Sequence, residues 1–258
     1  MLPKNFLPEK EYELIRLGKD NDGGYLVERN SLIDAKSLIS FGIANDWSFE
    51  KDFMKIKNCP IHCYDPFVKY SQIKKFSRKK IINFFKILNF FKKDYFKKTC
   101  NQVFLYKDYK KFFSGKVIHF QNSIGIGINK IEFSDVIKKI NNFPLFLKVD
   151  IEGSEYRILD EIIQHQKKIS GLIIEFHNLD INRNIVSNFI NKFELTLCHV
   201  HGQNLLGKEF LDKNNDPIQI EMTFSNSRKF INSKPKIPHP LDHPADQRFK
   251  EINLNFED

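Results

Sequence analysis

Short apolar runs alternate along the chain with stretches in which apolar residues recur at helical spacing. The runs predict strands over residues 38–41, 61–64, 117–120, 145–149, 171–178, 195–204 and 217–224. Strands that alternate with helices favour a parallel sheet covered by helices on both faces. The last two strands are close in sequence and joined by a polar loop, so they are expected to pair antiparallel. We therefore expect an α/β fold with a seven-stranded, mostly parallel sheet.

The organisation along the chain indicates one domain over residues 1–258, with one insertion. Residues 1–18 read as a short helical lead-in, and serines at 48, 134 and 154 are expected to begin helices. Residues 68–113 interleave lysine and phenylalanine with almost no glycine or proline, which predicts a basic helical insertion between the second and third strands.

Charge is concentrated in that insertion. The chain has a net charge of +9, yet residues 68–116 alone hold 15 Lys and Arg against 2 acids, a local balance of +13. The remainder is mildly acidic. Such a block can clamp a diphosphate-bearing substrate, bind nucleic acid or lie on an anionic membrane surface, or it can be an exposed helical pair whose phenylalanines pack on the main domain. We expect the last of these for most of its lysines.

Composition excludes several protein classes. Hydrophobic residues make up 41% of the 258 positions and charged residues 28%, as in an ordinary globular protein. The four cysteines form no CxxC pair, which argues against a disulfide framework or a zinc site. No apolar run is long enough for a transmembrane helix, and the start lacks the apolar core of a signal peptide. A cytoplasmic location is expected.

Candidate chemistry lies where the fourth predicted strand ends. The apolar run 145–149 is followed by Asp150 and Glu152, and Gly153 then turns the chain. In open α/β sheets, ligands bind in the crevice at the carboxyl ends of the strands. Acids at such a position are more often ordinary turn residues, so the position alone is weak evidence.

A second candidate lies after the first two strands. Gly42 and Ala44 follow the strand 38–41, where small residues allow a ligand to approach the backbone. Asp65 ends the next strand, 23 residues after Gly42. A carboxylate about 20 residues beyond a glycine turn is the arrangement that holds a ribose diol in nucleotide-binding folds. The alternative is a turn aspartate before Pro66.

Several motifs together resemble one family. They are RLGKDNDGGYLV, SFGIANDWSFE, LKVDIEGSEYRIL, IIEFHN and HVHGQN. The segment Lys148 to Glu155 resembles the K-x-D-x-E-G-x-E signature of the FkbM family of S-adenosylmethionine-dependent O-methyltransferases. The resemblance implies a class I methyltransferase fold of Rossmann-like type. It also implies methyl transfer to a sugar hydroxyl, on a nucleotide-linked sugar such as GDP-heptose for capsular polysaccharide. The basic insertion departs from the family's compact core, so no family role is carried onto it.

Under this resemblance, the cofactor S-adenosylmethionine is expected to contact Lys19, Asp22, Gly23, Gly24, Gly42, Ala44, Glu50, Asp65, Gln121, Asn122 and Asp150. The expected catalytic base is His177, with Asp150 as the second candidate or as the group that orients the histidine. Residues expected on the substrate side are Glu152, His199, His201 and Asn204, although each histidine could instead be a hydrogen-bonded strand-end residue.

No metal is expected. Related macrocin-type sugar methyltransferases use Mg²⁺ held by acids at the ends of the fourth and fifth strands. Here those places offer Asp150 and His177 with Asn178, a set poor in the oxygen ligands that Mg²⁺ prefers.

Two other functions stay open. One is an RNA methyltransferase that uses the basic insertion, although nucleic acid is the less expected partner. The other is a non-catalytic binding domain of the same fold. The sequence leaves the oligomeric state open, and a homo-oligomer is compatible with it.

Overall fold

The computed structural model describes the chain except for residues 70–72, 74–103, 129, 206 and 258. Its centre is a sheet of seven strands in the order β10-β11-β9-β8-β3-β4-β5. The strands are β3 (Ser37–Phe41), β4 (Ile61–Tyr64), β5 (Val117–Phe120), β8 (Leu145–Val149), β9 (Ile169–Phe176), β10 (Thr196–Gly202) and β11 (Ile220–Ser225). β11 lies between β9 and β10 and is antiparallel to both, whereas the other neighbours are parallel. The predicted seven-stranded sheet is confirmed.

Alternate residues of the central strands face opposite sides of the sheet. On β8, Phe146 enters one buried cluster while Leu145 and Leu147 enter the other. On β9, Ile173 and Leu172 divide in the same way. Both faces are therefore apolar, which explains why these strands read as continuous hydrophobic runs rather than as alternating ones.

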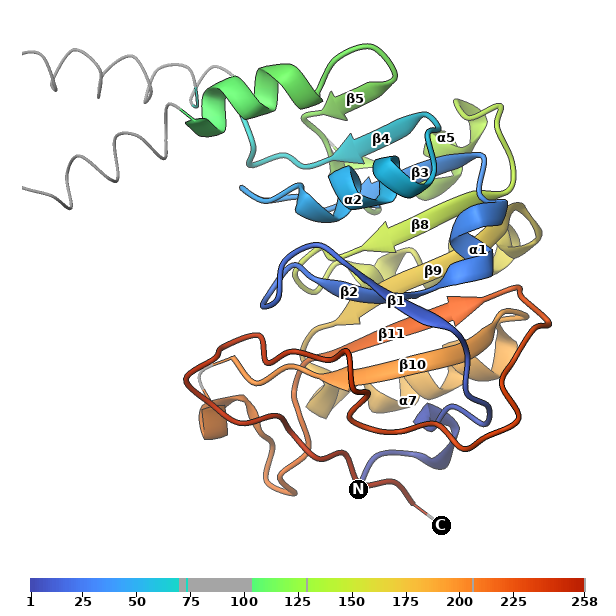
Figure 1. The fold of residues 1–258 in the computed structure, drawn as a ribbon, viewed down its shortest axis with the longest axis vertical. Helices are drawn as coiled ribbons and strands as arrows, with labels where there is room; N and C mark the ends of the chain where they lie inside the picture. The colour runs from blue at the N-terminus through green and yellow to red at the C-terminus, as the bar shows by residue number, and fades with distance from the viewer. Residues whose placement is uncertain (70–72, 74–103, 129, 206, 258) are drawn as a thin grey trace, which may run out of the picture.

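Helices cover both faces, as predicted (Figure 1). One face carries α1 (Arg29–Asp34), α2 (Ser48–Ile56) and a hairpin of β1 (Leu14–Leu17) with β2 (Tyr25–Glu28). The other face carries α5 (Phe133–Lys138), α6 (Leu159–Gln164) and α7 (Leu179–Lys192). No helix among the described residues is long and apolar enough to cross a lipid bilayer.

The helical lead-in predicted for residues 1–18 is wrong. Only Lys4–Phe6 forms a short 3-10 turn, and β1 pairs antiparallel with β2. The stretch is too short and too mixed to nucleate a helix, whereas the turn at residues 18–24 returns the chain for sheet pairing. Of the serine starts, α2 does begin at Ser48. Neither Ser134 nor Ser154 caps a helix, because α5 starts at Phe133 and Ser154 precedes a 3-10 turn, Glu155–Arg157.

The remaining short elements lie in connections. β6 (Ser123–Ile124) pairs with β7 (Lys130–Ile131) in a small parallel ladder after β5. Further 3-10 turns lie at Gln166–Lys168 and Gly207–Phe210.

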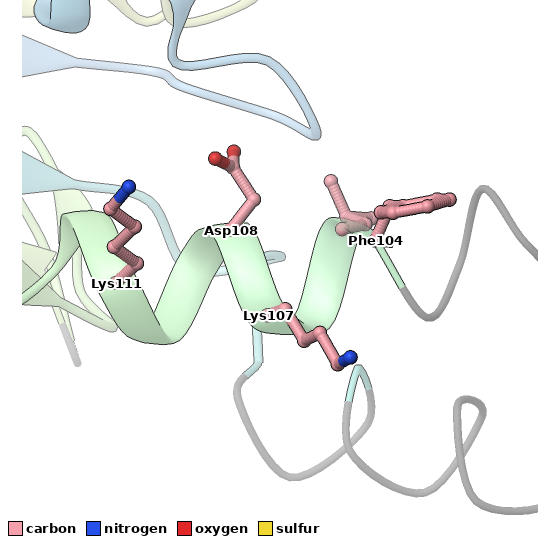
Figure 2. Close-up of a pocket in the computed structure, with 5 residues that line it drawn as sticks. Phe104, Lys107, Asp108 and Lys111 are labelled. Carbon is pink, nitrogen blue, oxygen red and sulfur yellow. The ribbon is translucent and has the colours of Figure 1, made fainter.

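Most of the basic insertion predicted at 68–113 lies outside the described residues. Its described end, residues 104–112, is helical and is fixed to the domain. The Asp108 carboxylate accepts a hydrogen bond from Trp47 Nε1 at 2.8 Å and pairs with Lys51 Nζ at 2.5 Å. Figure 2 shows Asp108 and Lys111 on one side of this helix and Lys107 on the other. All three residues line an open pocket of about 480 Å³. The Trp47 ring also packs edge-on against Tyr109.

The C-terminal tail runs along the outside of β10 (Figure 1). Three buried residues at the end of β10 bind it. His199 Nε2 lies 3.0 Å from the Asp242 carboxylate, and His201 Nε2 lies 2.9 Å from Glu251. The Asn204 amide donates to the carbonyl oxygens of Asp246, Phe249 and Lys250.

We predict that the tail contact makes stability depend on pH. Burial lowers the pKa of His201, but hydrogen bonds to Glu221 and Glu251, with the charges of Glu221 and Asp242, raise it to about 10. In the unfolded chain the imidazole pKa is about 6.5. The stabilising effect is therefore complete below about pH 6.5 and is lost as the pH rises to about 10. Urea unfolding should show the difference between wild type and His201→Asn shrinking over this range, and a constant difference would contradict the prediction.

Candidate functional site

The turn after β3 contacts the end of β8 directly. Gly42 has a φ of +77°, and a Cβ placed there would lie 1.7 Å from the carbonyl oxygen of Asp150. Ala44 is also left-handed, with a φ of 42°. On the other side of the turn, Lys148 Nζ donates to the Gly42 carbonyl at 2.8 Å. Only glycine satisfies both the backbone angle and the spacing at position 42.

Asp65 connects this turn to the end of β4. One carboxylate oxygen accepts hydrogen bonds from the amides of Ile43 (3.1 Å) and Ala44 (2.8 Å). The other accepts from Phe67 (2.7 Å) and Val68 (3.1 Å). Asp65 therefore shapes the loops on both sides of it. Its expected contact with a ribose remains a prediction, and any such contact has to share a carboxylate that already accepts four bonds.

A cavity of about 340 Å³ opens at this edge of the sheet. Its lining includes five of the predicted cofactor residues: Gly42, Ala44, Asp65, Asn122 and Asp150. The hydroxyl group of Tyr64, another lining residue, is buried and has no hydrogen-bond partner among the described residues. The size, the close backbone and the free polar group fit a nucleoside-containing ligand such as S-adenosylmethionine.

The other predicted cofactor residues lie elsewhere. Lys19, Asp22, Gly23 and Gly24 belong to the β1–β2 turn, which approaches the Gly42 turn through an ion pair of Lys19 with Asp46 at 2.8 Å. Glu50 is in the interior, where it accepts a hydrogen bond from Ser40 Oγ at 2.5 Å. Gln121 is exposed and is not part of the cavity lining.

The two predicted catalytic residues, Asp150 and His177, come together in a cluster of acids. His177 Nε2 lies 4.0 Å from Asp150, 3.4 Å from Glu152 and 3.8 Å from Glu175. Its Nδ1 lies 3.2 Å from Glu155. Burial lowers the pKa of His177, and the hydrogen bond and charge of Glu155 more than reverse this, so the pKa is raised.

Tyr25 and Lys148 hold this acidic cluster together. The Tyr25 hydroxyl lies 3.0 Å from Asp150 and 3.2 Å from Glu175 and can donate its single proton to either, and Gln219 also donates to Glu175. Burial and the nearby Asp150 charge raise the pKa of Glu175 well above its usual value. Burial alone would lower the pKa of Lys148, but the carboxylates around it, Asp150 foremost, raise it.

Three of these residues could hold a metal ion. Ligand atoms of Asp150, Glu175 and His177 all lie within 4.8 Å of one another. The expectation of no metal counted Asp150, His177 and Asn178, and it overlooked the oxygen ligands of Glu175. Tyr25 and Gln219 already donate to these oxygens, and Lys148 supplies a positive charge. The negative charge of the carboxylates is therefore balanced by groups of the protein itself. Metal independence stays a prediction.

The residues expected on the substrate side divide into two groups. Glu152 lines the cavity and is exposed. His199, His201 and Asn204 are buried under the tail and do not line this cavity. His199 and His201 are hydrogen-bonded residues near the end of a strand, which is the alternative given for them above.

Sequence reasoning assigned no role to Tyr25, Lys148, Glu155, Glu175 or Gln219. Signals existed for four of them. Lys148 and Glu155 belong to the K-x-D-x-E-G-x-E segment, Tyr25 ends the DGGY turn, and Glu175 precedes His177 by the period of a strand. Gln219 carries no such signal, because its contact with Glu175 depends on β11 pairing between β9 and β10.

The contact at Gly42 predicts a large effect of one methyl group. Gly42→Ala should destabilise the fold by about 3 kcal/mol or more, because left-handed strain adds to a clash with backbone. Gly115→Ala is the matched control, since Gly115 is also left-handed at +64° but has nothing within 4 Å. It should lose only about 1 kcal/mol. Chemical unfolding measures both, and equal losses would show that the Gly42–Asp150 contact is not the cause.

Three solved structures align with this chain at low sequence identity. Among solved structures, a precorrin-6y C5,15-methyltransferase from Geobacter metallireducens aligns at 9% identity, covering 76% of this chain and 84% of that chain, with a TM-score of 0.38. An rRNA methylase from Streptococcus thermophilus aligns at 9% identity, covering 76% and 92%, with a TM-score of 0.37. A fibrillarin/Nop5p complex aligns at 10% identity, covering 74% and 73%, with a TM-score of 0.36. Likenesses at this level carry no argument about activity.

A search of curated proteins gives no match. The family model of the FkbM methyltransferase domain, however, matches residues 34–193, which is more than half of the chain and includes β3, β8, β9 and the cluster around His177. The chain belongs to the FkbM methyltransferase family, and its methyl donor is S-adenosylmethionine.

Proposed function

We propose that this enzyme methylates a sugar hydroxyl, on a nucleotide-linked sugar such as GDP-heptose that serves capsular polysaccharide synthesis. The observation that carries the proposal is the cluster at the cavity edge. Asp150 and Glu152 line the cavity, and His177 Nε2 lies 3.4 Å from Glu152. These groups can accept hydrogen bonds from the hydroxyls of a sugar and remove a proton from one of them.

The cavity residues would hold the cofactor at its methionine and nucleoside parts. When bound, S-adenosylmethionine would supply a methyl group to the hydroxyl oxygen, and the carbon–sulfur bond would break to release S-adenosylhomocysteine. Gly42 and Ala44 permit close approach of the backbone, while Asp65 and Asn122 offer polar contacts. Holding two reactants in line can supply about 7–11 kcal/mol of the barrier reduction.

His177 is the proposed base, with Asp150 second. In the neutral imidazole, a proton on Nδ1 leaves the lone pair on Nε2, the nitrogen that lies nearest the cavity residues. Removal of the hydroxyl proton by such a group contributes about 10²–10⁴-fold to the rate. Asp150 accepts a hydrogen bond from Tyr25, which holds its carboxylate in place beside the imidazole.

The acidic character of this edge favours an uncharged sugar ring at the reacting atom, with the diphosphate of a nucleotide-linked sugar lying away from it. Asp150 and Glu152 repel the phosphates that a nucleic acid would bring close to the reacting atom. An RNA substrate nevertheless remains the second candidate, because residues 68–116 carry a local charge of +13. That nucleic acid is the less expected partner rests on the repulsion by Asp150 and Glu152 alone. Tight RNA binding that weakens steeply with salt would favour this alternative.

We predict that the cavity binds S-adenosylhomocysteine, the product of the cofactor. Calorimetric titration with S-adenosylhomocysteine should show binding at about micromolar Kd, near −8 kcal/mol. Asp65→Ala should weaken it at least about tenfold, because the turn at Ile43 and Ala44 loses its acceptor. Asp180→Ala, at the exposed start of α7, is the control and should bind as wild type. Absence of binding to wild type would overturn the methyltransferase function for this chain.

We also predict the effect of removing the proposed base on turnover. With nucleotide-linked sugars as acceptors, His177→Gln should lower kcat by about 10²–10⁴-fold while the Kd for S-adenosylhomocysteine stays unchanged. EDTA should leave wild-type turnover unchanged, and recovery of lost turnover by Mn²⁺ or Mg²⁺ would contradict metal independence. Cofactor binding without turnover on any sugar or RNA would favour a non-catalytic binding domain.

A further inference from the structure

The turn after β8 makes several hydrogen bonds to His177, the residue that follows β9. Glu155 is fully buried, and its carboxylate accepts a hydrogen bond from the Gly153 amide at 2.8 Å. The other carboxylate oxygen accepts from the His177 amide at 2.7 Å and lies 3.2 Å from His177 Nδ1. One side chain therefore contacts both the backbone and the ring of His177.

A second contact from the same turn fixes the other side of that residue. The Tyr156 hydroxyl donates to the His177 carbonyl oxygen. The next residue, Asn178, adopts a left-handed conformation with a φ of 51°. The amide, the carbonyl and the ring of His177 are thus all held by Glu155 and Tyr156, so the imidazole has little freedom to turn.

Carboxylates face both ring nitrogens, but among the described residues only Nδ1 makes a hydrogen bond to one, Glu155. Nε2 lies 3.4 Å or more from Glu152, Glu175 and Asp150. A carboxylate accepts hydrogen bonds and cannot donate them. Beside Glu155, the neutral imidazole of His177 is stable with its proton on Nδ1, which leaves the lone pair on Nε2. That nitrogen faces Glu152 at 3.4 Å and Asp150 at 4.0 Å, both of which line the cavity.

We propose that Glu155 is a positioning residue that fixes the tautomer and direction of the His177 ring, so that Nε2 is the nitrogen free to act on the acceptor hydroxyl. This rests on the proposed function, because it gives Nε2 a task there. Glu155 does not touch the cavity and acts only through His177.

Glutamine at position 155 separates this role from packing. It has nearly the same shape, but its amide group can donate to Nδ1 and so permits the tautomer with the proton on Nε2. Aspartate keeps the charge but is shorter, so it preserves the tautomer and shifts the ring. The pair of variants therefore distinguishes hydrogen-bond chemistry from reach.

The test is nitrogen NMR of the imidazoles in the full-length protein labelled with ¹⁵N-histidine. His177→Gln assigns the signal. Wild type should show the proton on Nδ1 in the neutral ring, Glu155→Asp should retain that form, and Glu155→Gln should shift the ring at least partly to the form with the proton on Nε2. Glu161→Gln is the matched control, because Glu161 is a carboxylate whose Oε2 likewise accepts a backbone amide bond, from Ser134, but it does not contact His177. It should leave the His177 signal unchanged.

Activity supplies a second readout. Glu155→Gln should lower kcat by about 10²-fold or more, as loss of the correct tautomer does in catalytic triads. The Kd for S-adenosylhomocysteine should remain that of wild type. A His177 signal with the proton on Nε2 in wild type, or an unchanged tautomer in Glu155→Gln, would overturn the proposal.

The two proposals fail in different ways. The tautomer is read without substrate, so a wild-type protein that methylates no sugar but shows the Nδ1 form defeats the proposed function and leaves the positioning of the ring intact. A protein that methylates a sugar but shows no tautomer change in Glu155→Gln defeats the positioning role alone.

Discussion

The contact between the Gly42 turn and the end of β8 is the constraint on which the rest of the site depends. No side chain fits between Gly42 and the carbonyl of Asp150, so the loops after β3 and β8 meet backbone to backbone. Lys148 Nζ donates a hydrogen bond to the Gly42 carbonyl, and the Asp65 carboxylate, at the end of β4, accepts from the amides of Ile43 and Ala44. The cavity exists at this edge because three strand ends are fixed to one another by short polar contacts.

The buried ammonium group of Lys148, which takes part in this contact, is surrounded by the carboxylates of Asp150, Glu50 and Glu175. Lys148 Nζ lies 3.9 Å from Asp150 and 5.0 Å from the centre of the Tyr25 ring. The Tyr25 hydroxyl, from the hairpin on the same face of the sheet, lies within hydrogen-bond distance of both Asp150 and Glu175. Burial of several acids is costly unless donors and a positive charge surround them. Here the donors come from β2, from β8 and from Gln219, the residue just before β11, so the electrostatic balance of the site depends on the whole sheet being assembled.

The sequence allowed the sheet and the approximate edge of the site to be predicted, because both depend on local patterns. Buried strands appear as apolar runs, and Gly42, Asp65 and Asp150 each end such a run. What could not be predicted depends on packing between distant segments. The tail covers His199 and His201, Gln219 reaches Glu175 only because β11 inserts beside β9, and residues 14–17 become a strand only by pairing with β2. Glu155 was present in a recognised motif, but its contact with His177 joins two strand ends that the motif alone does not bring together.

The anchoring of the basic insertion also has a mechanical consequence. The chain leaves the domain at Phe67 and Val68, whose amides bind the Asp65 carboxylate. It returns through the helix of residues 104–112, where Tyr109 bonds to His119 and His119 bonds to the Asp65 carbonyl. Both attachment points of the insertion therefore converge on a single residue of the cavity wall. Displacing Phe67, Val68 or Tyr109 would therefore strain hydrogen bonds that also fix Asp65 in the cavity wall.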